Sequence, residues 1–422
     1  MTQLRDRSNR APKAPTIARH GRMSRPAAWK TVLGLIGAAV VVALVAGGSI
    51  AAIATWSLAK DVKMTTIAAD TQGPPPNIAA MKGGFNILLV GTDTRVGQGD
   101  LGGGVRTEGT GALNDVNMLI HVAADQKSAV AVSIPRDMVV PIPKCDKGGP
   151  ASALPINNAL ALGGLACVAA TVQGLTGLNI DFAGLITFEG VIAMSDAVGG
   201  VDVCTNGPIR DKDSGLDIES AGTHNLSGAQ ALAFLRTRHK VGDGSDLSRI
   251  NSQQVYLSSL VRKIKSSDTL NDLTKVYGIA KAATQNITLS ENFSRLDTLA
   301  SIALVLKKIP LENIVFAQYP GTTGGSGVYA GKVQPNKAIA AKLFAAIKAD
   351  TPIGLDASAI GGDTAGSTLD PNAPQSTTTP DPGSTGSADG SGAGAGAGAG
   401  ETISGLKGQT AAQYTCSVAY HF

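Results

Sequence analysis

The sequence predicts an α/β fold, with a single layered αβα domain built around a mixed central β-sheet. Three observations support this prediction. Apolar runs of strand length alternate with segments of helical apolar spacing, a pattern typical of a sheet covered on both faces. The 422-residue chain is 43% hydrophobic, which is enough to fill a large core. The apolar and the Gly/Ser-rich extremes of composition lie outside this alternating region, near the two ends.

The N-terminal residues predict a cytoplasmic tail and one transmembrane helix. Residues 1–30 carry eight Lys/Arg and one Asp, and the run from Val32 to Ala54 has no charge. This run has the ~20 residues needed to span a bilayer. By the positive-inside rule, the tail stays in the cytoplasm and the rest of the chain lies outside the cell. A cleaved signal peptide is the alternative, although the run is longer than a typical signal core.

The net charge of +4 comes from this tail, so the sequence does not indicate a nucleic-acid-binding protein. We expect residues 1–30 as the tail, 31–56 as the transmembrane helix, 57–83 as an extracellular stalk and 84–350 as the folded domain. Residues 351–422, rich in Gly, Ser, Thr, Pro and Ala, should form a disordered tail. Strands are expected at 85–90, 116–123, 128–134, 182–188 and 313–318, and helices at 157–175, 190–198, 270–283, 296–306 and 336–349.

All four cysteines follow the predicted membrane span, in a compartment where disulfides persist. Four cysteines allow three pairings. Cys145 and Cys167 bracket a Gly/Pro-rich loop, so we expect that pair, which leaves Cys204 with Cys416. A buried free thiol at Cys204 is the alternative. Their spacing does not match a zinc site.

A cluster of cationic side chains is predicted around a glycine-containing loop. A helix beginning near Ser227 should deliver Arg236 and Arg238 to its C-terminal end. After the loop, Asp246 is expected to cap a second helix. On that helix Asp246, Arg249 and Gln253 would share one face. Forked guanidinium donors beside a helix N-terminus suit a phosphate or pyrophosphate. A salt-bridged surface loop is the alternative.

Further charged residues stand where predicted strands begin or end. Asp93 and Arg95 follow the first strand, Asp115 begins the second, and Arg136 with Asp137 ends the third. Together with the arginine cluster, these motifs resemble the LytR-CpsA-Psr family of cell-wall glycopolymer ligases. The resemblance runs from about residue 84 to about residue 350.

The resemblance implies a membrane-anchored phosphotransferase of cell-wall biogenesis. Its donor would be a glycopolymer on undecaprenyl pyrophosphate and its acceptor a hydroxyl of N-acetylmuramic acid in peptidoglycan. Mg²⁺ or Mn²⁺ would be held by Asp93 and Asp115, either of which could take the acceptor's proton. The implied catalytic residues are Asp93, Asp115, Arg136 and Arg249, and the implied pyrophosphate-binding residues are Arg95, Arg136, Arg236, Arg238, Asp246, Arg249 and Gln253. We expect Asp246 to orient Arg236 or Arg238.

One position departs from the family pattern. Leu113 stands where an arginine is usual, two residues before Asp115, and Arg106 is the nearest substitute. The missing arginine favours one alternative function, a non-catalytic sensor or scaffold that binds polyprenyl pyrophosphate. A pyrophosphatase is a further alternative. The family's fold implies an apolar channel for the lipid, which 159–172 and 182–194 could line, although apolar helices are more often plain core. The sequence leaves the identity of the polymer, the general base and the oligomeric state open.

Overall fold

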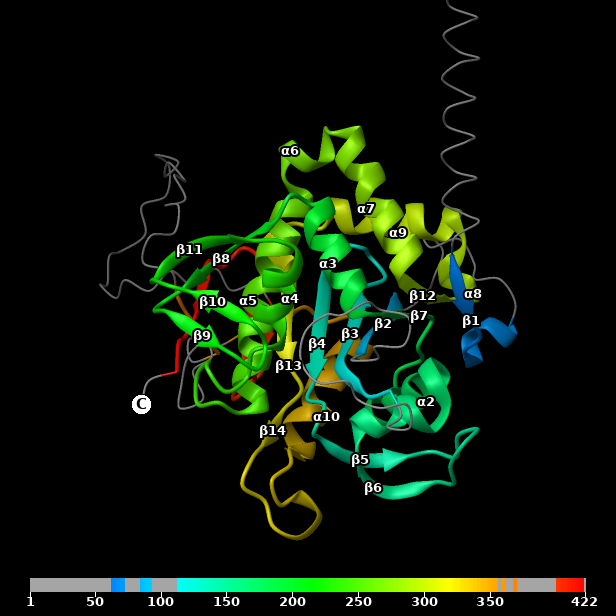
Figure 1. Ribbon diagram of the computed structural model, residues 1–422. Helices are drawn as coiled ribbons and strands as arrows, with labels where there is room; N and C mark the ends of the chain where they lie inside the picture. Colours follow the sequence, from blue (N-terminus) through cyan, green and yellow to red (C-terminus); the bar gives the residue numbers. More distant parts are fainter. Residues whose placement is uncertain are drawn as a thin grey trace, which may run out of the picture. The chain divides into compact units, whose positions relative to one another are not determined.

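The centre of the molecule is an eight-stranded sheet (Figure 1). The structure is a computed structural model, and it describes residues 62–72, 84–92, 112–355, 359–360, 367–369 and 400–420. All of these belong to one unit, Leu58–Phe422. In spatial order the strands are β1 (Lys63–Thr65), β12 (Ile287–Ser290), β7 (Phe182–Ile186), β2 (Phe85–Thr92), β3 (Asn114–Val122), β4 (Ala129–Ile134), β13 (Ile314–Gln318) and β19 (Gly408–Thr410).

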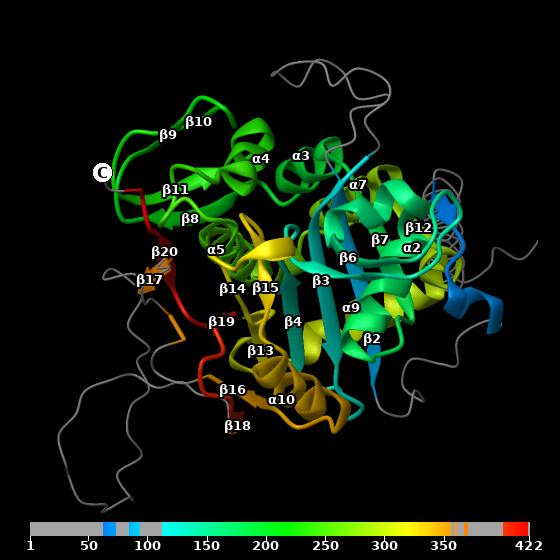
Figure 2. The same cartoon turned by 90° about the horizontal axis from the view of Figure 1, so that it is seen from below.

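Pairing in this sheet is mixed, as predicted. β2 is antiparallel to β3 but parallel to β7, and β4 is antiparallel to β3 but parallel to β13. Figure 2 shows β2, β3 and β4 side by side. The parallel pairs are joined through long connections that contain helices, as parallel pairing requires.

Helices cover both faces of the sheet because its strands alternate. Along β2, Leu88 and Val90 face one apolar core and Phe85 and Ile87 face another. The first core contains residues of helices α2 (Ala159–Thr176) and α10 (Lys337–Lys348). The second contains residues of α8 (Glu291–Ser294) and α9 (Leu296–Lys308), with the C-terminal half of α5 (Asp246–Lys265) packed against it. The predicted α/β fold with a mixed central sheet is confirmed.

A smaller sheet lies beside the first and carries its own apolar core. Its order is β11 (Gly222–Leu226), β8 (Val201–Thr205), β20 (Thr415–Ser417) and β17 (Ser367–Leu369). Helix α4 (Gly228–Arg236) and the middle of α5 pack on it through residues such as Phe234 and Tyr256. Helix α5 therefore touches both sheets, and the functional site described below forms at its N-terminal half.

The remaining described elements include three helices and four two-stranded sheets. Helix α3 (Phe188–Ala197) follows β7, and the helical pair α6 (Ser267–Leu270) and α7 (Leu273–Asn286) follows α5. Four two-stranded sheets complete the described strands: β5 (Val139–Ile142) with β6 (Ala151–Pro155), β9 (Ile209–Asp211) with β10 (Leu216–Ile218), β14 (Gly321–Thr322) with β15 (Gln334–Pro335), and β16 (Ile353–Gly354) with β18 (Glu401–Thr402).

Both expected disulfides are present, Cys145–Cys167 and Cys204–Cys416. The first ties the β5–β6 hairpin to α2 at a kink made by Gly163 and Gly164. A Cβ on Gly163 would lie 2.8 Å from Cys145 Cβ and 2.9 Å from Cys167 Cβ, so only glycine lets the two segments approach this closely. The second joins β8 to β20, which are parallel neighbours.

Two predicted boundaries are wrong. Residues 400–420, expected to be part of a disordered tail, supply β19 to the central sheet and β20 to the smaller one. Residues 62–72, expected in the stalk, supply the edge strand β1 and the buried Ile67. Each of these strands has three residues, too few to show a period of two, and its pairing with a distant strand is not visible in the local sequence.

Among the described residues one helical stretch, Ile156–Thr176, is long and apolar enough to cross a membrane. It contains α2, whose residues Val168 and Val172 are fully buried against the central sheet, so it is a core helix of this domain. The predicted span at 31–56 and the predicted tail at 1–30 lie outside the described residues.

Candidate functional site

A pocket of about 620 Å³ lies between the central sheet and helices α3, α4 and α5. Its two ends differ in chemistry. We call one the cationic end, which is lined by Asp115, Arg136, Arg236, Arg238, Arg249 and Gln253. We call the other the apolar chamber, which is lined by Leu89, Met118, Ile186, Phe188, Val191, Met194, Leu232, Leu257, Leu260 and Ile287.

The N-terminus of α5 builds the floor of the cationic end. Ser245 is the N-cap, since its side chain accepts a hydrogen bond from Ser248 N. The prediction that Asp246 is the cap is therefore wrong by one residue. Asp246 instead stands in the first turn, where the helix dipole favours a carboxylate. It lies 2.5 Å from Arg249 Nη2 across one turn, and both side chains are buried.

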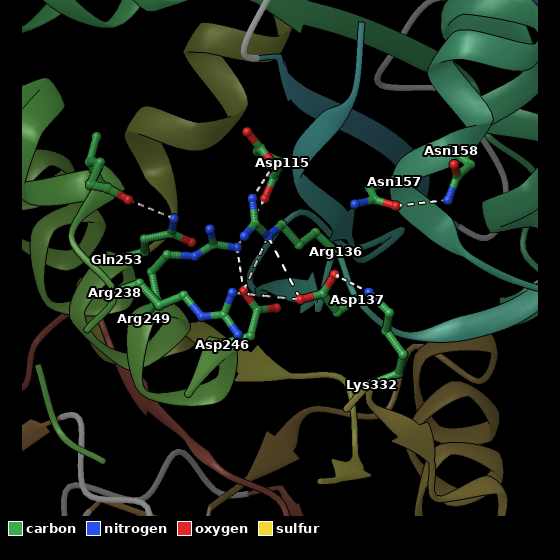
Figure 3. Close-up of polar contacts among 11 residues, drawn as sticks. Asp115, Arg136, Asp137, Asn157, Asn158, Arg238, Asp246, Arg249, Gln253 and Lys332 are labelled. Atoms are coloured by element: carbon green, nitrogen blue, oxygen red, sulfur yellow. Dashed lines mark hydrogen bonds and ion pairs between the residues drawn. The ribbon is translucent and has the colours of Figure 1, made fainter. Parts of the chain in front are cut away.

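A second ion pair forms at the ends of β3 and β4. Arg136 Nη1 donates to Asp115 Oδ1 at 2.6 Å, and Arg136 Nε lies 3.7 Å from Asp246 Oδ1. Arg249 Nη2 also donates to the backbone oxygen of Asp115 at 3.4 Å. Figure 3 shows the side chains of Arg136, Arg238 and Arg249 gathered around Asp246. The predicted convergence of the arginines is thus present.

The expected partner of Asp246 is wrong. Asp246 pairs with Arg249 and approaches Arg136, whereas Asp137 approaches Arg238, with 3.9 Å between Asp137 Oδ2 and Arg238 Nη1. Sequence spacing alone favoured Arg236 or Arg238 as the partner of Asp246. The i,i+3 geometry of α5 places Arg249 much closer.

Arg236 and Gln253 sit where the two ends of the pocket meet. The Arg236 guanidinium lies over the Phe188 ring, 4.7 Å from its centroid, so a cation–π contact orients it. Gln253 Nε2 donates to the backbone oxygen of Leu235 at 3.0 Å. That bond ties α5 to the end of α4 and fixes the loop that carries the arginines.

Burial and neighbouring carboxylates shift the pKa values of the arginines in opposite directions. Burial lowers the pKa of Arg249, which the Asp246 carboxylate only partly offsets. Burial also acts to lower the pKa of Arg136, but the combined carboxylates of Asp115, Asp246 and Asp137 raise it overall. Within the described part of the chain, the Nε atoms of Arg136, Arg238 and Arg249 are buried with no hydrogen-bond acceptor. Three buried guanidinium N–H groups therefore lack acceptors, which an anionic ligand at this end can supply.

The apolar chamber comes only partly from the predicted segments. From 182–194 the chamber takes Ile186, Phe188, Val191 and Met194. The other expected segment, 159–172, belongs to α2 and packs into the core on a different part of the sheet. The sequence of a continuously apolar helix does not distinguish a helix that lines a channel from one buried in the core.

Only one of the two predicted metal ligands belongs to the described residues. Asp115 lines the pocket, while Asp93, Arg95 and Arg106 lie outside the described residues. No group of three or more His, Cys, Asp or Glu side chains gathers among the residues that the structure describes. Mg²⁺ takes one or two carboxylates and completes its shell with water and phosphate oxygens, so Asp115 fits as one such ligand. Leu113 directly precedes β3 and is not among the lining residues of the pocket.

Several site residues had no sequence signal. Asp211, Asp213 and Ser214 line the pocket from the β9–β10 turn, and Lys332 forms an ion pair with Asp137. They belong to short hairpins whose position depends on tertiary contacts. Asn157, two residues before α2, donates its backbone N–H to Arg136 O at 3.1 Å. Its side chain accepts from Asn158 Nδ2 at 3.0 Å.

Fold and site together define a class: a mixed α/β domain whose pocket is lined by a cluster of arginines and by an apolar chamber. Such a pocket suits a ligand that carries phosphate at one end and hydrocarbon at the other. Residues 46–346 match the model of the LytR_cpsA_psr family. The chain belongs to this family.

Two curated relatives illustrate the similarity. The chain is 32% identical over 287 residues to the cell wall biosynthesis protein LcpA of Corynebacterium glutamicum, a match that covers 60% of this chain and 53% of LcpA. It is 28% identical over 263 residues to the polyisoprenyl-teichoic acid–peptidoglycan teichoic acid transferase TagT of Bacillus subtilis, covering 61% of this chain and 74% of TagT. The chain thus spans about half the length of LcpA.

A solved structure supports the fold. The crystal structure of B. subtilis TagV superposes with a TM-score of 0.52 at 22% identity, covering 64% of this chain and 98% of TagV.

Proposed function

We propose that this protein is a membrane-anchored phosphotransferase that moves a glycopolymer from a polyprenyl-pyrophosphate carrier to a hydroxyl of peptidoglycan. The observation that carries the proposal is the division of one pocket into a cationic end and an apolar chamber. A pyrophosphate suits the first and a polyprenyl chain suits the second. The activity for which TagT is named, polyisoprenyl-teichoic acid–peptidoglycan teichoic acid transfer, agrees with this chemistry.

In the proposed step, the acceptor oxygen bonds to the phosphorus that carries the polymer. The bond from that phosphorus to the bridging oxygen breaks, and polyprenyl phosphate leaves with the electron pair. Arg136, Arg238 and Arg249 stabilise the charge that spreads over the phosphoryl oxygens. Asp115 or Asp93 takes the proton of the acceptor hydroxyl. Arg95, Arg236 and Gln253 bind the pyrophosphate, and Asp246 holds Arg249 in place.

We further propose that Asp115 and Asp93 hold Mg²⁺ or Mn²⁺. When bound, the ion would neutralise phosphate charge. Arg136 would then release or share Asp115 Oδ1, which it contacts at 2.6 Å. We also propose that the charge-free run from Val32 to Ala54 anchors the protein in the cell membrane. The basic residues before this run would keep the N-terminus in the cytoplasm and place the domain outside.

The test is reconstitution of the transfer. The full chain in detergent micelles is incubated with Mg²⁺, a polyprenyl-pyrophosphate oligosaccharide and a muramic-acid-containing glycan, and the products are analysed by mass spectrometry. We expect a phosphodiester-linked product that disappears in Asp115→Asn and Arg249→Met and on addition of EDTA. Leu304→Ala, on the exposed surface of α9, is the matched control and should leave the product unchanged.

The other outcomes separate the alternatives. Tight lipid binding without any product, unchanged by EDTA, would contradict the transferase and leave a polyprenyl-pyrophosphate-binding sensor or scaffold. Release of polyprenyl phosphate without the joined product would indicate a pyrophosphatase that uses water as the acceptor.

A further inference from the structure

Lys332 reaches the cationic end from the hairpin formed by β14 and β15, far in sequence from every predicted motif. The backbone fixes its position on both sides. Val333 N donates to Asp137 O at 3.1 Å, and Val139 N donates to Val333 O at 3.0 Å, so this segment runs beside the residues that follow β4. Lys332 Nζ lies 3.4 Å from Asp137 Oδ1.

The Asp137 carboxylate is shared among three cations. One oxygen, Oδ1, contacts Lys332. The other, Oδ2, lies 3.9 Å from Arg238 Nη1 and 4.0 Å from Arg136 Nε. Figure 3 shows Lys332 and Arg238 approaching Asp137 from opposite sides. Asp137 is only 8% exposed, so water contributes little to its solvation and the three cations stabilise its charge.

Of these three, Lys332 makes the closest contact and is the only one absent from the pocket lining. Arg136 and Arg238 both line the pocket, where an anionic ligand would compete with Asp137 for them. Each 3.9–4.0 Å contact to Asp137 is longer than a hydrogen bond, so neither arginine is fully committed to the carboxylate.

We infer that Lys332 is a positioning residue for the anion-binding arginines. By holding Asp137 Oδ1, it satisfies the carboxylate from outside the pocket, so that Asp137 does not draw Arg238 and Arg136 away from the ligand phosphates. Without Lys332, Asp137 would draw Arg238 into a close ion pair, and a ligand phosphate would then have to displace a buried carboxylate. This inference rests on the proposed function, because it concerns binding of the same pyrophosphate.

The test uses the full chain in detergent micelles and geranylgeranyl pyrophosphate as the probe, with binding measured by calorimetry. Lys332→Met should weaken binding about tenfold, roughly the contribution of one charge-assisted hydrogen bond. Asp137→Asn should leave the affinity near that of the wild type, because no carboxylate then competes. The double variant Lys332→Met/Asp137→Asn should recover to within about threefold of the wild type. Lys342→Met, an exposed lysine on α10, is the matched control.

The affinity of the double variant decides whether the inference holds. If the double variant binds as weakly as Lys332→Met, Lys332 acts on the ligand directly or only supports the fold, and the positioning role is wrong. A melting temperature of Lys332→Met matching that of the wild type, with weakened binding, supports the positioning role. A weakened affinity explained by a proportionate loss of folded protein contradicts it.

The proposed function and this inference can fail separately. If the wild type binds no polyprenyl pyrophosphate, the proposed function fails. The inference is then tested on the free protein through the ¹⁵Nε NMR signal of Arg238. That signal should shift in Lys332→Met and return in the double variant. An unchanged signal would overturn the inference.

Discussion

The two ends of the pocket are held in place by different physics. At the cationic end, buried charges fix one another: Asp246 holds Arg249 and Asp115 holds Arg136. In the apolar chamber, side chains from β2, β3, β7, β12, α3, α4 and α5 meet, and apart from the Arg236–Phe188 contact they are apolar surfaces without a preferred direction. A buried charge pair requires one geometry. Removing one partner strongly destabilises the fold, because the other charge stays buried without compensation. Apolar packing tolerates many substitutions that conserve volume. The predictions below test this difference, beginning with the largest effect.

Arg249→Met should have the largest effect, because it removes a phosphate ligand and leaves the Asp246 carboxylate buried without its closest partner. We expect a loss of about 10³-fold in transfer rate and of about 3–5 kcal/mol in unfolding free energy. Adding Asp246→Asn should restore most of the stability and none of the activity. Denaturant unfolding and the transfer assay measure the two separately. If stability stays low in the double variant, the pair is not what stabilises this end.

Leu260→Trp tests the chamber. The larger ring would displace about three methylene groups of a bound polyprenyl chain, each of which contributes ~0.8 kcal/mol to the binding free energy. We expect affinity for geranylgeranyl pyrophosphate to fall about 50-fold while inorganic pyrophosphate binds unchanged. Leu304→Trp, on the 59%-exposed position of α9, is the control. Equal losses for both ligands would mean that the chamber does not hold the hydrocarbon.

Arg236→Lys probes the junction of the two ends. Lysine keeps the charge but loses the planar contact with the Phe188 ring, which typically contributes about 1 kcal/mol. We expect binding of the pyrophosphate lipid to weaken about fivefold, with unfolding free energy nearly unchanged. Phe188→Leu should give a similar loss, and the double variant should lose no more than either single change. Additive losses would show that the two residues act independently.

The smallest effect concerns Asp243 in the loop between the arginines. Burial acts to raise its pKa, but hydrogen bonds from Ser245 and Ser248 lower it overall. A lowered pKa means that the ionised form stabilises the fold. This contribution is complete above the ordinary value of 3.8 and is lost as the pH falls through the lower folded pKa.

We therefore expect Asp243→Asn to cost about 0.5 kcal/mol of unfolding free energy at pH 7, a small figure because solvent screens this exposed group. The difference from the wild type should shrink toward zero below pH 4. Urea unfolding at pH 7 and at pH 3 measures it. A difference that persists in acid would contradict the assignment to the ionised carboxylate.

The sequence predicted the long elements well because each carries its own periodicity. The strands predicted at 128–134 and 313–318 lie within one residue of β4 and β13, and the helix predicted at 336–349 within one residue of α10. The edge strand β1 and the strands after residue 400 were missed. They are three residues long or shorter, and only pairing with distant strands makes them strands at all.

The sequence predicted which residues gather at the site but not which of them form ion pairs with one another. Motif spacing brought Arg136, Arg238 and Arg249 together. It could not place Asp246 against Arg249 and Asp137 against Arg238, because those choices depend on where β4 ends relative to α5. Lys332 carried no signal, since a lysine in a glycine-rich hairpin is usually a solvated surface residue. Tertiary contact alone brings it to Asp137.

The covalent link between Cys204 and Cys416 also sets an order of events during synthesis. Strand β20 lies between β8 and β17, and β19 closes one edge of the central sheet, so neither sheet is complete until translation has passed residue 417. The two linked cysteines are 212 residues apart. At about 5–20 residues per second, that separation corresponds to roughly 10–40 seconds. During this time Cys204 is a free thiol on an unfinished sheet, able to react with the wrong partner.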